Sequence, residues 1–135
     1  MDIQILLNSI HWLPVIVLTV FSFLLGNLWH SPLMFGKIWK ADNHYDVPKD
    51  QLNLPLLFGG TAVLHFMALA ALNAVCVERG AWGGFLIGFL VSIVWIFTAM
   101  GATYLFANRP VRLLLIDAGM YVTLFAVAGL IFGIW

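Results

Sequence analysis

The sequence predicts an all-α, polytopic membrane protein, with four transmembrane helices in a bundle and a short interfacial segment in the first loop. The 135-residue chain is 63% hydrophobic and only 9% charged, with a mean hydropathy of +1.02. A soluble domain carries about 25% charged residues. The apolar residues also fall into runs of about 20, the length that crosses a bilayer as a helix. We therefore expect the lipid bilayer to surround most of the chain.

Four segments meet the length of a span and form a single transmembrane domain over residues 1–135. Two of the three connections are short polar turns, VERGAWGG at 77–84 and ANRP at 107–110. Proline at the end of the second turn suits the first turn of a helix. The remaining connection is the loop 31–53. The predicted spans are 10–30, 54–77, 81–106 and 111–135.

The connections differ in their basic residues, which predicts the orientation. The turn 77–84 carries only Arg79, whereas the remaining Lys and Arg lie in the other two connections and at the start of the last span. Because short cytoplasmic loops are rich in Lys and Arg, we predict loop 31–53 inside and both termini outside. The net charge is zero, so the chain lacks the excess of basic residues that binds nucleic acid. We therefore expect no nucleic-acid partner. The basic residues are Lys37, Lys40, Lys49, Arg109 and Arg112, with Arg112 opening the last span.

The first loop holds residues that can ligate metals, namely Asp42, His44, Asp46 and Asp50. They follow no recognised ligand spacing, so we predict no metal site. A bis-histidine haem needs two histidines at one level, and His65 has no such partner in the predicted spans. We therefore predict no cofactor.

Asp117 is a carboxylate inside the last predicted span, about 7 Å beyond Arg112 along the helix. A charge at the bilayer centre costs at least about 2.5 kcal/mol, so such residues face the interior and pair. Arg112 lies on another side of that helix, whereas Tyr121 follows at i+4. Each predicted helix places a polar residue in the cytoplasmic half, which predicts a polar vestibule there. Its expected residues are Asn27, His30, Thr61, His65, Tyr104, Arg112, Asp117 and Tyr121.

Two interpretations of Asp117 remain open. A buried aspartate that is hydrogen-bonded to neighbouring helices can be a structural clamp, since polar contacts between helices are common in lipid. Alternatively, Asp117 is an ion or proton site within the vestibule. As a clamp, Asp117→Asn should keep much of the hydrogen bonding and most of the stability, whereas as an ion or proton site the variant should fold normally and lose function.

The outer half of the predicted bundle contains two G-x-x-x-G patterns at similar depth. GFLIG runs from Gly84 to Gly88, and GLIFG runs from Gly129 to Gly133. Small residues let helix backbones approach closely in lipid. We predict that both faces lie at helix–helix contacts, within or between protomers, and that they close the outer side.

GNLWHSPLMFGKIWK at 26–40 resembles the signature G-x-L-W-Y-S-P-L-x-F-G-K-x-W of a bacterial family of small four-helix membrane proteins of unknown function. The likeness extends to RPVRLLLIDAGMYV and to the terminal GLIFGIW. It implies a four-span fold in a bacterial inner membrane and no particular activity. His30 replaces the usual Tyr. The characteristic positions that the resemblance implies are Trp29, Ser31, Pro32, Phe35, Gly36, Lys37, Trp39, Asp117 and Gly119.

Three classes of function fit this architecture. The first is a non-enzymatic membrane protein whose vestibule binds or passes a small polar solute, ion or lipid headgroup. The alternative is an accessory or structural subunit of a homo-oligomer or larger membrane complex. The third, an enzyme using Asp117 as acid or base, lacks a second strong catalytic group. We expect no enzymatic activity.

Overall fold

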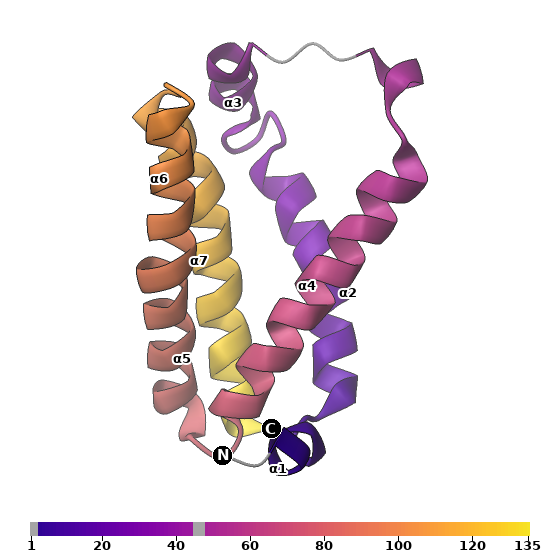
Figure 1. The fold of residues 1–135 in the computed structure, drawn as a ribbon, viewed down its shortest axis with the longest axis vertical. Helices are drawn as coiled ribbons and strands as arrows, with labels where there is room; N and C mark the ends of the chain where they lie inside the picture. The colour runs from indigo at the N-terminus through magenta and orange to yellow at the C-terminus, as the bar shows by residue number, and fades with distance from the viewer. Residues whose placement is uncertain (1–2, 45–47) are drawn as a thin grey trace.

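A computed structural model describes residues 3–44 and 48–135. The described part of the chain is helical throughout its regular structure and contains no strand. Two short segments depart from the α-helix: η1 is a 3₁₀ turn, and η2 is a π-helical stretch inside a longer helix. Figure 1 shows the arrangement. The elements are α1 (Ile3–Asn8), α2 (Trp12–Trp29), α3 (Gly36–Asn43), η1 (Lys49–Gln51), α4 (Leu54–Cys76), α5 (Gly80–Val91), η2 (Ser92–Phe97), α6 (Thr98–Phe106) and α7 (Val111–Ile134).

Four of these helices are long and apolar enough to cross a membrane: α2, α4, the continuous helix α5–η2–α6, and α7. The prediction of an all-α protein with four membrane-spanning helices is therefore confirmed. The helix ends differ from the predicted spans by at most two residues.

The largest difference in helix bounds lies at the N-terminal side, where α2 begins at Trp12 rather than at residue 10. The backbone N–H of His11 donates to the Asn73 side chain of α4, 2.8 Å away, instead of joining a continuous helix. The preceding residues form the separate helix α1, which the sequence did not predict.

The central helix is α7, which packs against α2, α4, α5 and α6. Half of its most apolar stretch is buried, 50% against 28% or less in the other three spans. Its buried residues run from Leu113 to Gly133, over nearly its whole length. The other spans therefore share α7 as their common packing surface.

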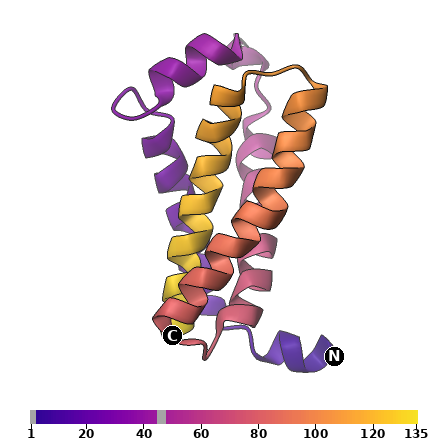
Figure 2. The ribbon, with the colours of Figure 1, turned by 90° about the vertical axis from the view of Figure 1, so that its left-hand side faces the viewer.

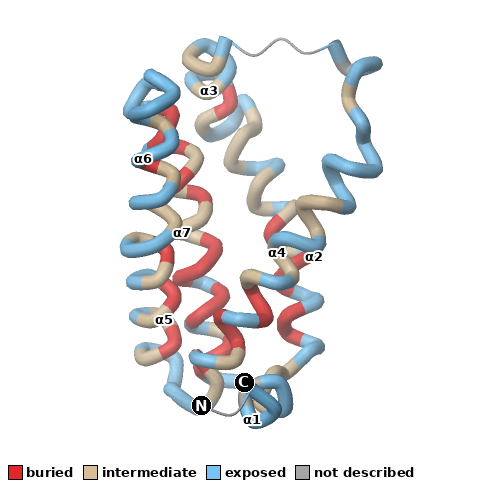
Figure 3. The backbone as a smooth tube through the Cα atoms, viewed as in Figure 1, coloured by how far each residue is buried: buried red, intermediate tan, exposed pale blue. Residues whose placement is uncertain are grey.

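Helices α2 and α4 pack closely at one end only. The buried residues of α2 lie in its first two thirds, from Pro14 to Ser22, and those of α4 lie in its last third, from Leu69 to Cys76. Figure 3 shows this burial gathered near the end that carries α1, while α4 diverges from α7 toward η1. Figures 1 and 2 place α3 at this diverging end, opposite to α1. The fold is thus closed on the α1 side and open on the α3 side.

The two G-x-x-x-G faces lie against one another, one on α5 and one on α7. A Cβ atom added to Gly84 would lie 2.0 Å from the Gly129 carbonyl oxygen, and one added to Gly133 would lie 2.2 Å from the Gly80 carbonyl oxygen. Gly88 meets the backbone of Phe125 in the same way. The backbones touch directly, as small residues permit in lipid.

Candidate functional site

Asp117 accepts hydrogen bonds from side chains that come from three different segments. The indole Nε1–H of Trp39, on α3, donates to Oδ1 at 2.8 Å. The Nε2 atom of His30, just after α2, lies 3.1 Å from the same oxygen. The Tyr104 hydroxyl of α6 donates to Oδ2. The carboxylate therefore ties α3, α6 and the end of α2 to the central helix α7, and its side chain is only 17% exposed.

Hydrogen-bond geometry makes His30 the counter-charge of this carboxylate. Its Nδ1 lies 3.0 Å from the carbonyl oxygen of Gly26, which can only accept. Its Nε2 faces the Asp117 carboxylate, which also accepts when ionised. With Asp117 ionised, both ring nitrogens donate, and His30 is then an imidazolium. The hydrogen bond to Asp117 raises the pKa of His30 above its ordinary value, against the opposing effect of burial.

The 26–40 motif forms a compact turn that brings these groups together. Its Trp29 donates from Nε1 to the carbonyl oxygen of Ile116 on α7, at 2.8 Å. Gly119 leaves room for this indole, since a Cβ there would lie 3.3 Å from the Trp29 ring. Gly36 is required by close packing, because a Cβ would lie 2.2 Å from the carbonyl oxygen of His30. Helix α3 therefore begins in contact with the end of α2, and Trp39 lies one helical turn further along α3.

The remaining motif residues stabilise the turn or lie on its surface. The Ser31 carbonyl accepts from the backbone N–H of Gly36 at 2.9 Å, and the Ser31 hydroxyl donates to the Leu28 carbonyl at 2.7 Å. The Phe35 ring packs on Trp29 with centroids 4.9 Å apart. Pro32 and Lys37 are exposed.

Arg112 does not join Asp117. Its Nε donates to Asp42 Oδ2 at 2.6 Å, and its NH2 group donates to the other oxygen of the same carboxylate. This paired hydrogen bond lowers the pKa of Asp42 below its ordinary value. Asp42 is thereby an ion-pair partner that fastens the end of α3 to the start of α7. Asp46, its neighbour in the first loop, lies outside the described residues.

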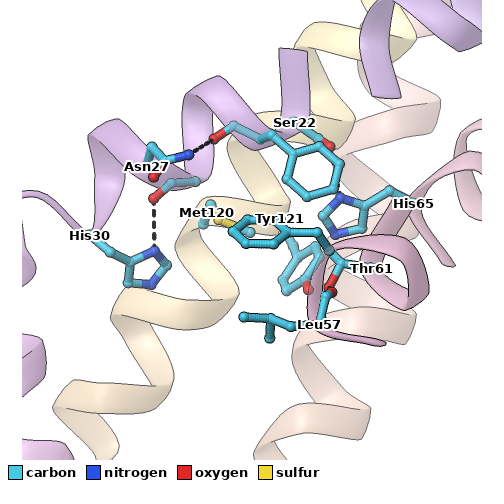
Figure 4. A pocket seen from close by; sticks show the side chains of 11 residues that line it. Ser22, Asn27, His30, Leu57, Thr61, His65, Met120 and Tyr121 are labelled. Carbon is cyan, nitrogen blue, oxygen red and sulfur yellow. Dashed lines mark hydrogen bonds between the residues drawn. The ribbon is translucent and has the colours of Figure 1, made fainter. Parts of the chain in front are cut away.

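A cavity of about 340 Å³ lies next to the Asp117 cluster, between α2, α4 and α7. His30 belongs to both, since it lines the cavity and hydrogen-bonds Asp117. Figure 4 shows the side chains that line it, with Asn27 and His30 hydrogen-bonded to carbonyl oxygens of Phe23 and Gly26. The lining residues are Ser22, Phe23, Gly26, Asn27, His30, Leu57, Phe58, Thr61, His65, Met120 and Tyr121.

The tautomer of His65 follows from its neighbours on α2. The Ser22 hydroxyl donates its only hydrogen to the Thr19 carbonyl, 2.6 Å away. Ser22 Oγ must then accept from His65 Nδ1, at 2.7 Å. In the neutral ring this leaves Nε2 as an acceptor, and Nε2 has no hydrogen-bond partner in residues 3–44 and 48–135.

The predicted vestibule residues thus separate into three places. His30, Tyr104 and Asp117 form the carboxylate cluster, and Arg112 forms the ion pair with Asp42. The other residues, together with His30, line the cavity. These cavity-lining residues are Asn27, Thr61, His65 and Tyr121.

Sequence reasoning missed several residues of the site. Trp39 was expected only as a characteristic position of the family resemblance, with no role at the vestibule, yet it donates to Asp117. Ser22, Phe23, Phe58 and Met120 were not expected at the cavity. Ser22 offered one signal, since it lies inside a span and needs a partner there. The aromatic residues and the methionine look the same in sequence as lipid-facing residues.

Comparison with known proteins shows a family and no activity. No curated protein and no solved structure matches the chain. A family model described as "Protein of unknown function (DUF1761)" matches residues 13–133, which include all four spans and the 26–40 motif. The chain belongs to this family, DUF1761.

Proposed function

We propose that this multi-pass membrane protein binds a small amphipathic molecule in the cavity between α2, α4 and α7, without chemical conversion. The observation that carries the proposal is the lining itself. It combines apolar walls from Phe23, Leu57 and Phe58 with polar groups such as His65 Nε2, which no described residue engages. Cavities that bind small molecules are mostly apolar with a few placed polar groups, and span about 300–1,000 Å³.

The cavity is placed for entry from the α3 end. There α2 and α4 diverge, whereas near α1 they bury their side chains against each other and α7. We propose that the α3 end faces the cytoplasm of a bacterial cell, with both termini outside. Supporting this orientation, α3, η1 and the start of α7 carry Lys37, Lys40, Lys49 and Arg112. The other end has only Arg79, in the turn between α4 and α5.

The subunit alternative has less support. The sequence supports it only through the G-x-x-x-G faces, which could join copies of the chain or other membrane subunits. In the structure Gly84 and Gly88 of α5 meet the backbone of α7 within one chain. Those faces are therefore occupied without a partner.

The cavity proposal is tested by filling the cavity. Thr61→Phe places a ring among the lining residues, whereas Val63→Phe places the same ring on the outward face of α4, where Val63 is 58% exposed. Protein purified in mild detergent is extracted, and its co-purified small molecules and lipids are identified by mass spectrometry. We expect wild type and Val63→Phe to retain the same molecule and Thr61→Phe to lose it. Identical extracts from all three proteins would contradict the proposal.

A further inference from the structure

Most polar side chains that line the cavity already donate their hydrogens to acceptors within the protein. The atoms that remain available to a ligand are therefore mainly hydrogen-bond acceptors. The Thr61 hydroxyl donates to the Leu57 carbonyl at 2.6 Å, so its oxygen can only accept from a ligand. His65 donates from Nδ1 to Ser22, so Nε2 is an acceptor. His30 directs both N–H groups away, to Gly26 and Asp117.

Two further side chains complete this count. Asn27 uses one amide hydrogen on the Phe23 carbonyl at 2.9 Å, and its amide oxygen remains available as an acceptor. The Tyr121 hydroxyl can either donate or accept. Among the described side chains that line the cavity, only the Tyr121 hydroxyl and the second amide hydrogen of Asn27 can donate to a ligand. On the cavity wall the available acceptors therefore outnumber the donors that remain available to a ligand.

Aromatic rings from α2, α4 and α7 line the cavity. His65 contacts Tyr121 edge-on, with centroids 5.8 Å apart, and Phe23 lies 6.1 Å from His65 and 6.2 Å from Phe58. Aromatic faces attract a cation within about 6 Å of their centroids. Among the described residues no Lys or Arg lines the cavity, and the charge of His30 is balanced by Asp117. The described cavity wall therefore carries no unbalanced positive charge that would repel a cationic ligand.

We propose that the ligand carries a primary ammonium group on an apolar body, and that its N–H groups donate to acceptors of the cavity wall, among them His65 Nε2 and Thr61 Oγ1. This inference rests on the proposed cavity function and names its ligand class. An ammonium supplies three donors and no acceptor, which suits a wall whose available groups are mainly acceptors. The same group occurs on soluble alkylamines and on the headgroup of phosphatidylethanolamine, and the cavity chemistry is common to both.

The test compares probes that share a butyl chain. Radiolabelled n-butylammonium, n-butanol and n-butyrate are added to purified wild-type protein in detergent, and binding is measured by scintillation proximity. We expect saturable binding of n-butylammonium and much weaker binding of the other two. Thr61→Val removes one acceptor without changing shape and should weaken n-butylammonium binding by about three- to tenfold. His65→Phe keeps a ring but removes Nε2, and should weaken it at least as much.

Thr103→Val is the matched control. Its hydroxyl also donates to its own helix, to the Ala99 carbonyl at 3.0 Å, but Thr103 is exposed on α6 and lies outside the cavity lining. This variant should bind n-butylammonium as wild type does. Equal loss in Thr103→Val and Thr61→Val would place the amine elsewhere and contradict the inference.

Nanodiscs distinguish the two sources of the ammonium. Protein reconstituted in equal parts phosphatidylethanolamine, phosphatidylcholine and phosphatidylglycerol is released and analysed by native mass spectrometry. Selective retention of phosphatidylethanolamine, lost in Thr61→Val, indicates the lipid headgroup; no selective retention together with n-butylammonium binding indicates a soluble amine. Both outcomes support the inferred ligand class.

The remaining outcomes overturn one or both proposals. If n-butyrate, n-butanol or phosphatidylcholine bound as well as the primary amine, with the same sensitivity to Thr61→Val, the cavity would be a binding site and the ammonium inference would be wrong. If no probe or lipid bound in a way that depended on Thr61 or His65, both the inference and the proposed function would be wrong.

Discussion

Asp117 shows how a carboxylate is accommodated inside a membrane-spanning helix. Its two oxygens accept from Trp39, His30 and Tyr104, and the imidazolium of His30 balances its charge. The pair is neutral overall, which reduces the cost of a charge within the bilayer. These contacts favour the clamp interpretation of Asp117, while the adjacent cavity offers the ligand-facing groups.

The first prediction concerns removal of the charge at Asp117. Asp117→Asn keeps one oxygen for Trp39 but loses the ion pair with His30 and the ionised partner of Tyr104. Hydrogen bonds to charged groups contribute about 1.5–3 kcal/mol each. We therefore expect the free energy of unfolding in detergent to fall by an amount in that range, with a lower melting temperature. Asp117→Leu, which removes every acceptor, should be less stable still. Unchanged melting of both variants would rule out the clamp.

The second prediction concerns pH. The pKa of His30 is raised above 6.5 in the folded protein, so folding favours its protonated form. Its contribution to stability should be fully present below pH 6.5 and should be lost as pH rises through the raised pKa. Thermal denaturation across this window measures the effect. His30→Tyr supplies a neutral hydroxyl donor to Asp117 and should flatten the profile; an equally steep profile in this variant would contradict the assignment.

Part of the site could be predicted from single residues. The cost of a charge in lipid places Asp117 toward the interior, and depth along the helices names His30 and Tyr104 among its neighbours. Trp39 could not be found in this way, because its position depends on the turn at Gly36, where two backbone segments touch. Nor could the pairing of Arg112 with Asp42, since the first loop has no periodic pattern that fixes its path.

At the scale of elements, the contact between α5 and α7 is set by glycine. The carbonyl oxygen of Phe125 would lie 2.0 Å from a Cβ at Gly88, and the Gly84 carbonyl oxygen would lie 2.2 Å from a Cβ at Gly129. The sequence predicts helix contacts at these positions, because small residues at matched depth favour close approach. It leaves open whether the partner helix belongs to the same chain, since the pattern is identical in both cases.

The third prediction follows from this contact. Gly88→Leu must push the backbones of α5 and α7 apart, and overpacking of this kind costs about 1–3 kcal/mol or more. We expect a clearly lower melting temperature in detergent. Gly59→Leu is the matched control, because a Cβ at Gly59 meets no atom within 4 Å. Equal melting temperatures for the two variants would show that the backbone contact does not stabilise the fold.

The whole molecule is asymmetric along its length. Packing of α2, α4 and α7 is dense near α1, and α4 diverges from α7 near α3, where the cavity lies. Apolar composition and span length predicted the four helices, because those features depend on the bilayer alone. The angle between α2 and α4 could not be predicted, since both helices are apolar on nearly every face and carry no stripe that marks the packed side.

The central claim is that the cavity between α2, α4 and α7 opens at the α3 end and can be reached from water there. Thiol labelling tests it most directly. The wild-type chain, whose free Cys76 is buried, gives the background labelling. Thr61→Cys places a thiol in the cavity, and Val63→Cys places one on the exposed, lipid-facing side of the same helix. A charged, membrane-impermeant reagent is applied to oriented vesicles from one side at a time. We predict rapid labelling of Thr61→Cys from the α3 side only and none of Val63→Cys; a protected Thr61→Cys, or labelling from the α1 side, would contradict the account.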